Sequence, residues 1–279
     1  MRSRPGDRPE RAAPYTRRVE AAFFDLDKTV IARSSLMAFA PSLRRHGLLT
    51  RRVMAQGAWS QLLYLRWGAG PRRLERIQRT VLAVISGWDR KEVGELVAAG
   101  LAEAIDPITH GQARERIRWH RAEGRPIVLV SAAPEEIVEP IGRRLGFDHV
   151  IASQAVVDPE GRYTGVLERY VYGPAKAALM QDLARREGID LEGSWAYTDS
   201  FTDLPMLEAV GHPVVVNPDR ALRRVAQMRG WPVERFDVPP PDSAPRRRAL
   251  APVIAVALTT GGLTAWWMLR RPPRLAASP

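Results

Sequence analysis

The chain has 279 residues, of which 45% are hydrophobic and 26% charged, which suits one globular α/β domain with a sizeable insertion. It contains no cysteine, so disulfides, zinc-thiolate sites and cysteine nucleophiles are excluded, and catalysis must use oxygen or nitrogen groups. The net charge of +11 fits nucleic acid, an anionic membrane surface or a phosphorylated substrate, and composition does not choose among them.

The N-terminal region changes character near residue 19. Residues 1–18 carry six arginines and three prolines without an apolar run, which predicts a disordered basic arm. Residues 19–26 form a short apolar run, typical of a buried parallel strand, and a polar cluster with two carboxylates follows. Ligands of open α/β sheets bind at the carboxyl ends of the strands, so this cluster is a candidate site.

A helical block follows this strand. Residues 49–67, 71–85 and 89–104 have apolar residues at spacings of three and four, which indicates helices with one buried face. The alternation of strands and helices then resumes, with strands expected at 126–131, within 149–167 (two strands), at 194–197 and at 213–216, and helices at 134–145, 176–187 and 204–209. This order predicts an α/β fold, a parallel sheet with an inserted α-helical cap.

The C-terminal region predicts a membrane anchor. Residues 238–248 contain four prolines and read as an extended linker, and the 21 residues 249–269 carry no charge. About 20 residues of helix cross a bilayer. We therefore expect a transmembrane helix at 249–269, a short tail at 270–279 and a membrane-anchored protein whose catalytic domain is cytoplasmic. The alternative is a buried or partner-binding helix.

Two aspartates, Asp25 and Asp27, stand at the end of the first predicted strand. Strand alternation places both side chains on one face, and the turn out of the sheet lets them converge on one ligand. One carboxylate can attack phosphorus while the other protonates the leaving oxygen and then activates water. Carboxylate oxygens also suit Mg²⁺. The alternative is an Asp-x-Asp turn that only caps a helix.

Two later residues suit a bound phosphoryl group. Ser131 ends the second predicted strand, where its hydroxyl and the N–H groups that follow can hold phosphate oxygens. Lys176 opens a helix after a Gly-Pro turn and is one of only three lysines among 42 lysines and arginines, which favours a need for a compact ammonium. The alternatives are an ordinary turn serine and a solvated lysine.

Two further aspartates follow the short strand at 194–197. Asp199 stands at the strand end, where it could bind a metal, and Asp203 lies one helical turn later, where it could orient Asp199 or a metal-bound water. The same spacing is also typical of a plain helix N-terminus, so capping is the alternative role.

Taken together, these segments resemble, in order and spacing, the four motifs of haloacid dehalogenase superfamily phosphatases. The best match is subfamily IB, which includes phosphoserine-phosphatase-like hydrolases, and it covers about residues 19–237. The resemblance implies a Rossmann-like parallel sheet with a helical cap. It also implies that Asp25 is the nucleophile and Asp27 the general acid and base, with Ser131 and Lys176 holding the phosphoryl group.

The resemblance further implies Mg²⁺ as the cofactor, bound by Asp25, the carbonyl of Asp27 and Asp199, with Asp203 supporting the metal site. One position departs from the pattern of phosphoserine phosphatases. Their glutamate nine residues beyond the nucleophile reads the substrate ammonium, whereas this chain has Ser34 there. Free phosphoserine is therefore not the expected substrate.

The predicted cap has nine arginines between residues 44 and 79, which would form either a solvated face or a surface for anionic lipid or substrate. Together with the predicted anchor, they suggest a phosphorylated small molecule or lysophospholipid-like substrate. Nucleic acid is not an expected partner, because no recognised nucleic-acid motif occurs.

The sequence thus predicts a magnesium-dependent phosphatase that works through an aspartyl-phosphate. The alternatives are a phosphotransferase of the same fold and a membrane-tethered, non-catalytic binding protein. The expected domains are an arm at 1–18, a core at 19–33 and 119–237, a cap at 34–118, a linker at 238–248, the anchor at 249–269 and the tail at 270–279.

Overall fold

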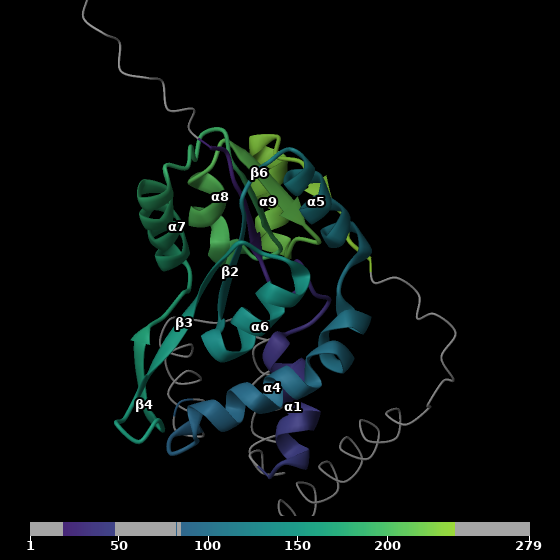
Figure 1. Ribbon diagram of the computed structural model, residues 1–279. Coiled ribbons are helices and arrows are strands. Elements are labelled where there is room, and N and C mark those ends of the chain that lie inside the picture. The colour runs from purple at the N-terminus through teal and green to yellow at the C-terminus, as the bar shows by residue number, and fades with distance from the viewer. Residues whose placement is uncertain (1–18, 48–81, 83–84, 238–279) are drawn as a thin grey trace, which may run out of the picture. The chain divides into compact units, whose positions relative to one another are not determined.

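A computed structural model describes residues 19–47, 82 and 85–237, and its central feature is a seven-stranded sheet (Figure 1). The strand order is β4-β3-β2-β1-β5-β6-β7, and every neighbouring pair is parallel except β3 and β4. The predicted α/β fold with a mostly parallel sheet is confirmed. The strands are β1 (Ala22–Asp25), β2 (Ile127–Pro134), β3 (His149–Val157), β4 (Tyr163–Arg169), β5 (Trp195–Thr198), β6 (His212–Val216) and β7 (Val233–Glu234).

Helices separate most of these strands along the chain. They are α1 (Ser35–Arg45), α4 (Arg90–Ile105), η1 (Asp106–Ile108), α5 (Gly111–Ala122), α6 (Glu135–Leu145), α7 (Pro174–Glu187), η2 (Phe201–Asp203), α8 (Leu204–Glu208) and α9 (Arg220–Arg229). The strands and helices expected between residues 126 and 216 are all present, with ends that differ by a few residues.

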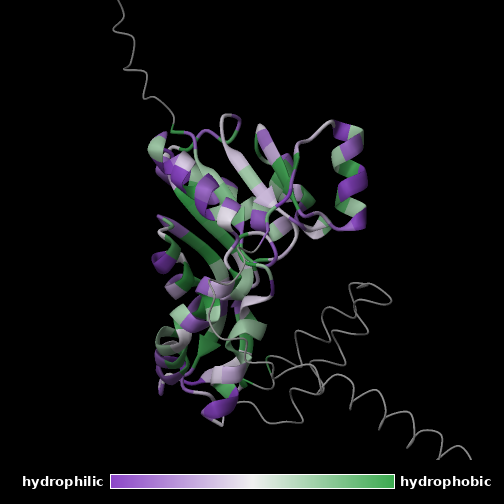
Figure 2. Ribbon diagram, turned by 90° about the vertical axis from the view of Figure 1, so that its right-hand side faces the viewer, coloured by the Kyte–Doolittle hydropathy of each residue, from purple (hydrophilic) through white to green (hydrophobic). Residues whose placement is uncertain are grey.

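Side chains of the central strands alternate between two hydrophobic clusters, one on each face of the sheet. Ala22 and Phe24 of β1 belong to the cluster covered by α1, α4, α5 and α6, whereas Phe23 belongs to the cluster covered by α7, α8 and α9. Figure 2 shows hydrophobic strands in the interior and helices with mixed colouring around them. Because both faces are covered, the parallel strands are almost wholly apolar, which made them recognisable in the sequence.

Two elements, α9 and β7, are not among those predicted from the sequence. The helix α9 has four arginines and buries only Leu222 and Ala226, although its apolar and polar residues do separate onto two faces. The strand β7 has two residues, too few for a period to appear. The predicted helix at 49–67, most of that at 71–85, the N-terminal arm and the C-terminal anchor lie outside the described residues. Within the described ranges, no helix is long and apolar enough to span a bilayer.

The segment between β1 and β2 leaves the sheet and returns to it through two neighbouring backbone segments. Ile31 and Thr109 form an antiparallel bridge, which is flanked by hydrogen bonds from the Ala32 N–H to the Ile108 carbonyl (2.8 Å) and from the His110 N–H to the Val30 carbonyl (3.0 Å). The inserted helices α1 and α4 pack against each other and against α6 (Figure 1). The insertion therefore starts and ends at one place, beside the carboxyl end of β1.

His120 of α5 is a fully buried imidazole beneath the sheet. Its Nε2 lies 2.9 Å from the hydroxyl of Tyr197, and its Nδ1 has no hydrogen-bond partner. Burial, reinforced by the charges of Arg125 and Arg116, lowers the pKa of His120 from 6.5 to about 3. The native state therefore keeps this imidazole neutral.

We expect His120 to make the fold sensitive to acid. The folded pKa lies below the unfolded value of 6.5, so on acidification the unfolded chain takes up a proton before the native chain does. Stability is then lost as the pH falls below 6.5, by up to about 1.4 kcal/mol per pH unit from this group. Urea unfolding at pH 7 and pH 5 should show a smaller loss in His120→Gln than in the wild type, and equal losses would contradict the assignment.

Candidate active site

The candidate site lies where β1, β2 and β5 end. Asp25, the last residue of β1, pairs in register with Val130 of β2, and Phe24 pairs with Tyr197 of β5. Since neighbouring strands lie about 4.8 Å apart, the chain positions just after these pairs are adjacent at one sheet edge. The register therefore brings the predicted residues Asp25, Ser131 and Asp199 to a common edge.

The chain leaves β1 through a tight turn that holds Asp27. The carbonyl of Leu26 accepts hydrogen bonds from the N–H groups of Val30 (3.0 Å) and Ile31 (3.1 Å). The Asp27 carboxylate accepts the N–H of Ser35 at 2.8 Å, the first residue of α1. Burial raises the pKa of Asp27, and the Ser35 hydrogen bond opposes that shift. Asp27 thus joins the sheet edge to the first inserted helix.

Lys176 is positioned by the entry to α7. Gly173 has φ +56° directly before Pro174, a left-handed conformation that favours glycine, and its carbonyl accepts the N–H of Lys176 at 3.1 Å. The side chain is 3% exposed, and its Nζ donates to Asp25 Oδ1 at 2.6 Å and to Asp203 Oδ2 at 2.7 Å. The alternative of a solvated lysine is therefore wrong.

The protonation states of the three buried groups Asp25, Lys176 and Asp203 depend on one another. Burial opposes the charge of Lys176, but the carboxylates of Asp25 and Asp203 outweigh it and raise the lysine pKa. Burial also raises the pKa of Asp25, while Lys176 acts in the opposite direction. A buried ammonium shared by two carboxylates has a net negative charge, so a further cation would stabilise the ionised form of Asp25.

Asp203 has a second partner that the sequence analysis missed. The hydroxyl of Thr198 donates to Asp203 Oδ2 at 2.8 Å, the same oxygen that receives Lys176. The family resemblance implies that Asp203 supports a metal site, whereas its direct contacts in the structure orient Lys176. Thr198 directly precedes Asp199, but its hydrogen-bond partner is Asp203, five residues further along the chain. The sequence alone does not indicate this pairing.

Asp199 is 9% exposed, and no described residue donates a hydrogen bond to its carboxylate. Burial raises its pKa to about 7, with Lys28 opposing and Asp203 adding to the shift. Lys28 has φ +67°, a left-handed conformation that is costly for a residue with a side chain. A buried carboxylate without hydrogen-bond donors fits a position beside a bound cation.

Ser131 lies in β2 at an irregularity of the pairing with β3, between Val130 and Pro134. It is 2% exposed, and its hydroxyl oxygen accepts the N–H of Ala133 at 3.1 Å. Ser153 of β3, another residue not foreseen, donates to the Ala132 carbonyl at 2.8 Å. The predicted strand end at Ser131 is therefore wrong: β2 continues to Pro134, and β3 holds the residues that follow Ser131 in place.

The donor set at this edge fits a hard divalent cation. Among residues 19–47, 82 and 85–237, no three acidic or histidine side chains stand together as a ready-made metal cage. The Asp25 and Asp199 carboxylates and the Asp27 carbonyl offer oxygen ligands, while Mg²⁺ commonly keeps several waters and takes oxygens from a substrate phosphate. The residues therefore fit Mg²⁺ together with substrate rather than a closed structural site.

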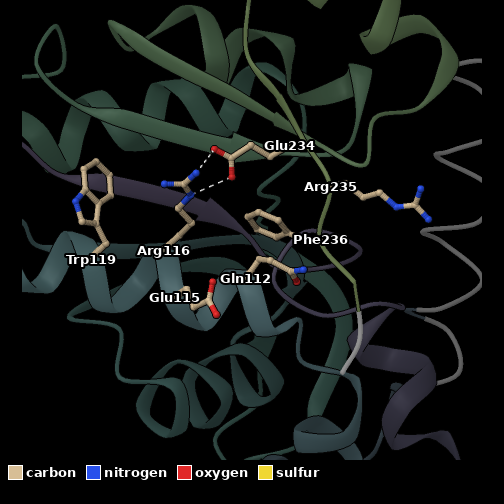
Figure 3. A pocket seen from close by; sticks show the side chains of 7 residues that line it. All are labelled: Gln112, Glu115, Arg116, Trp119, Glu234, Arg235 and Phe236. Carbon is tan, nitrogen blue, oxygen red and sulfur yellow. Dashed lines mark hydrogen bonds and ion pairs between the residues drawn. The ribbon is translucent and has the colours of Figure 1, made fainter. Parts of the chain in front are cut away.

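A separate pocket of about 450 Å³ lies between α5 and the chain after β7 (Figure 3). Arg116 forms a two-pronged ion pair with Glu234, with distances of 3.0 and 2.6 Å, and Trp119 lies along the same helix. None of the predicted site residues lines this pocket. The chemistry described above therefore does not take place there.

Comparison with known proteins agrees with the resemblance seen in the sequence. The model of the haloacid dehalogenase-like hydrolase family matches residues 22–208. The "Inhibition of morphological differentiation protein" of Streptomyces azureus is 46% identical, over 92% of this chain and 95% of that protein. A probable phosphatase of Mycobacterium tuberculosis is 42% identical, over 97% of this chain and 96% of that protein.

A solved structure shares the fold over most of the described region. It is a protein of unknown function from Bordetella pertussis, with a TM-score of 0.67 and 29% sequence identity. The match covers 77% of this chain and 97% of that one. The similarity therefore extends beyond the motifs to the arrangement of the elements that carry them.

Proposed function

Because the chain belongs to the haloacid dehalogenase-like hydrolase family and is a phosphatase, we propose that it hydrolyses a phosphate monoester through an aspartyl-phosphate on Asp25, with Mg²⁺ as cofactor. The observation that carries this proposal is the buried Lys176, whose ammonium lies 2.6 Å from Asp25 at the end of β1. A lysine held there offsets the negative charge of an arriving phosphoryl group, which would otherwise repel the carboxylate.

The residues of the chain divide the reaction into two displacements. In the first, a carboxylate oxygen of Asp25 bonds to phosphorus, the bond to the leaving oxygen breaks, and Asp27 gives its proton to that oxygen. In the second, a water molecule loses a proton to Asp27 and attacks phosphorus. The bond between phosphorus and the Asp25 oxygen breaks, and inorganic phosphate and free Asp25 result.

The phosphoryl oxygens would lie against Ser131, the N–H groups that follow it, and Lys176. Magnesium, when held by Asp25, Asp199 and the Asp27 carbonyl, would neutralise charge on those oxygens. Asp203 keeps the ammonium of Lys176 directed at Asp25. Their placement at one sheet edge supports these proposed roles.

The proposal is tested by measuring phosphate release from a panel of monoesters with Mg²⁺ and with EDTA. We expect turnover with Mg²⁺, loss of nearly all of it with EDTA, and its return when Mg²⁺ is added back. Activity that persists without divalent cations would contradict the cofactor assignment. Consumption of substrate only when an alcohol acceptor is added would instead identify a phosphotransferase.

For the substrate, we propose a membrane-associated monoester such as a lysophospholipid that ends in a phosphate. Ser34, which stands where phosphoserine phosphatases have a glutamate, is the N-cap residue of α1 and precedes the residue whose N–H binds Asp27. This position offers no charge for an ammonium. Faster hydrolysis of phosphoserine or a sugar phosphate than of lysophosphatidic acid would contradict this part of the proposal.

We also propose that residues 249–269 anchor the protein in a membrane with the phosphatase domain in the cytoplasm. The support is the uncharged length of this segment in the sequence, and the segment lies outside the described residues. Flotation of the full chain with lipid vesicles, compared with a chain ending at residue 237, tests this.

A further inference from the structure

The turn between β6 and α9 contacts the loop that carries Asp199 and Asp203. Its last residue is Asp219, which caps α9 by accepting the N–H of Leu222 on Oδ1 at 2.8 Å. The other carboxylate oxygen, Oδ2, accepts the N–H of Phe201 at 2.8 Å. One side chain therefore joins the start of a helix to the candidate site.

The backbone of Asp219 makes a further bond to the same loop. Its N–H donates to the Asp199 carbonyl at 2.9 Å. Asp219 thus holds the loop on both sides of Ser200, at the carbonyl of Asp199 and at the N–H of Phe201. Two bonds so close together fix both the position and the direction of the peptide that links them.

The other hydrogen bonds of the loop near this point are local, from the Ser200 N–H to Thr198 Oγ1 (3.3 Å) and from the Asp203 N–H to the Ser200 carbonyl (3.1 Å). Phe201 begins the three-residue helix η2, and its side chain is 43% exposed, so packing does not hold it. Ser200 caps the N–H of Thr202 at 3.4 Å, a long hydrogen bond. A first N–H of a helix without a partner is costly, and Asp219 supplies that partner.

Asn217 fixes this turn through hydrogen bonds to the chain after β7. This residue has φ +42°, an uncommon conformation for a residue other than glycine. Its side chain bonds the backbone of Phe236 twice, from Nδ2 to the carbonyl at 2.7 Å and from the Phe236 N–H to Oδ1 at 3.2 Å. Phe236 is 2% exposed, so the turn is fastened to the core.

We propose that Asp219 is a positioning residue of the phosphatase site: through its carboxylate and its N–H it fixes the loop that presents Asp199 to the cation and Asp203 to Lys176. The inference rests on the proposed function for its consequence in catalysis. Its structural part, the restraint on the loop, stands independently of that function.

Asp219→Ala tests this against Asp89→Ala as a matched control. Asp89 caps α4 in the same way, by accepting the N–H groups of Lys91 (2.8 Å) and Glu92 (3.0 Å). Within the described ranges it contacts no residue of the site. Both variants lose a helix cap, and we expect a similar fall in Tm for both. Only Asp219 touches the site loop.

In Asp219→Ala we expect kcat to fall by roughly tenfold to a hundredfold, because displaced groups at a reacting centre lose rate steeply. Calorimetric titration should show weaker Mg²⁺ binding, and hydrogen exchange should show a faster-exchanging Phe201 amide. Asp89→Ala should keep wild-type values in all three measurements. Asp219→Asn retains one oxygen acceptor, so its kcat, Mg²⁺ affinity and Phe201 amide exchange should lie between those of the wild type and Asp219→Ala. This variant replaces Asp219→Ala in the test if the alanine variant does not fold.

Unchanged kcat, Mg²⁺ binding and Phe201 exchange in the Asp219 variants would overturn the inference, as would equal changes in Asp89→Ala. Activity of Asp25→Asn would instead refute the proposed function. The exchange of the Phe201 amide reports on the loop in either case, so the two failures are distinguishable.

Discussion

Replacing Asp25 by asparagine is expected to lower kcat by roughly a thousandfold or more, because loss of a covalent nucleophile removes the pathway itself. Asparagine keeps the shape of the side chain and can still accept the Lys176 ammonium through its oxygen. The fold should therefore survive, and near-wild-type Tm values would show that the loss is chemical. Phosphate release at saturating substrate and Mg²⁺ measures the effect.

Asp182→Asn is the matched control for this substitution. Asp182 is an exposed carboxylate of α7 that pairs with Arg185, and it lies outside the site. Its amide variant should keep wild-type kcat. If Asp25→Asn retained a substantial share of the activity, another group would have to be the nucleophile. Acid-quenched reactions with labelled substrate should trap phosphate on the wild-type protein and not on the Asp25 variant.

Replacing Lys176 by methionine should have the largest effect on stability. The side chain is 3% exposed and satisfies two buried carboxylates, so its loss leaves Asp25 and Asp203 without their shared cation. Breaking a buried ion pair on one side costs about 3–5 kcal/mol. Urea unfolding at pH 8 should show a loss of this order, and activity should be lost as well.

The loss of stability in Lys176→Met should shrink at lower pH. Without the lysine, the native pKa of Asp25 rises further above its unfolded value of 3.8, so the native state binds more protons than the unfolded chain as the pH falls. The difference from wild type is then smaller at pH 5 than at pH 8. Lys91→Met, at a lysine that is 87% exposed, should change neither stability nor activity. A Lys176→Met protein as stable as the wild type would mean that the lysine is not buried between these carboxylates.

The strands could be predicted because burial on both faces leaves a plain apolar run, and the end of β1 could be predicted closely because polar residues follow at once, whereas β2 runs past Ser131 to Pro134. For that reason, the sequence predicts that one sheet edge carries Asp25, Ser131 and Asp199. The order of the strands in the sheet could not be derived from the residues alone, since it depends on which helices cover which face.

The contacts of Asp203 and Asp219 show where a sequence is uninformative. Both residues look like ordinary helix caps, and Asp219 is one. Their additional partners come from other elements: Lys176 lies 27 residues before Asp203, and Phe201 lies 18 residues before Asp219. Spacing along one helix or strand does not encode such pairs, so only the assembled fold identifies them.

The hydrophobic cluster on one face of the sheet continues without interruption into the inserted helices. It joins Phe24 of β1 and Ile141 of α6 to Val97 of α4 and Phe39 of α1. An insertion attached only through two neighbouring backbone segments is exchangeable for another when it shares no core with the sheet. Here an exchange would uncover one side of α6, so α1 and α4 should melt together with the sheet in a single calorimetric transition.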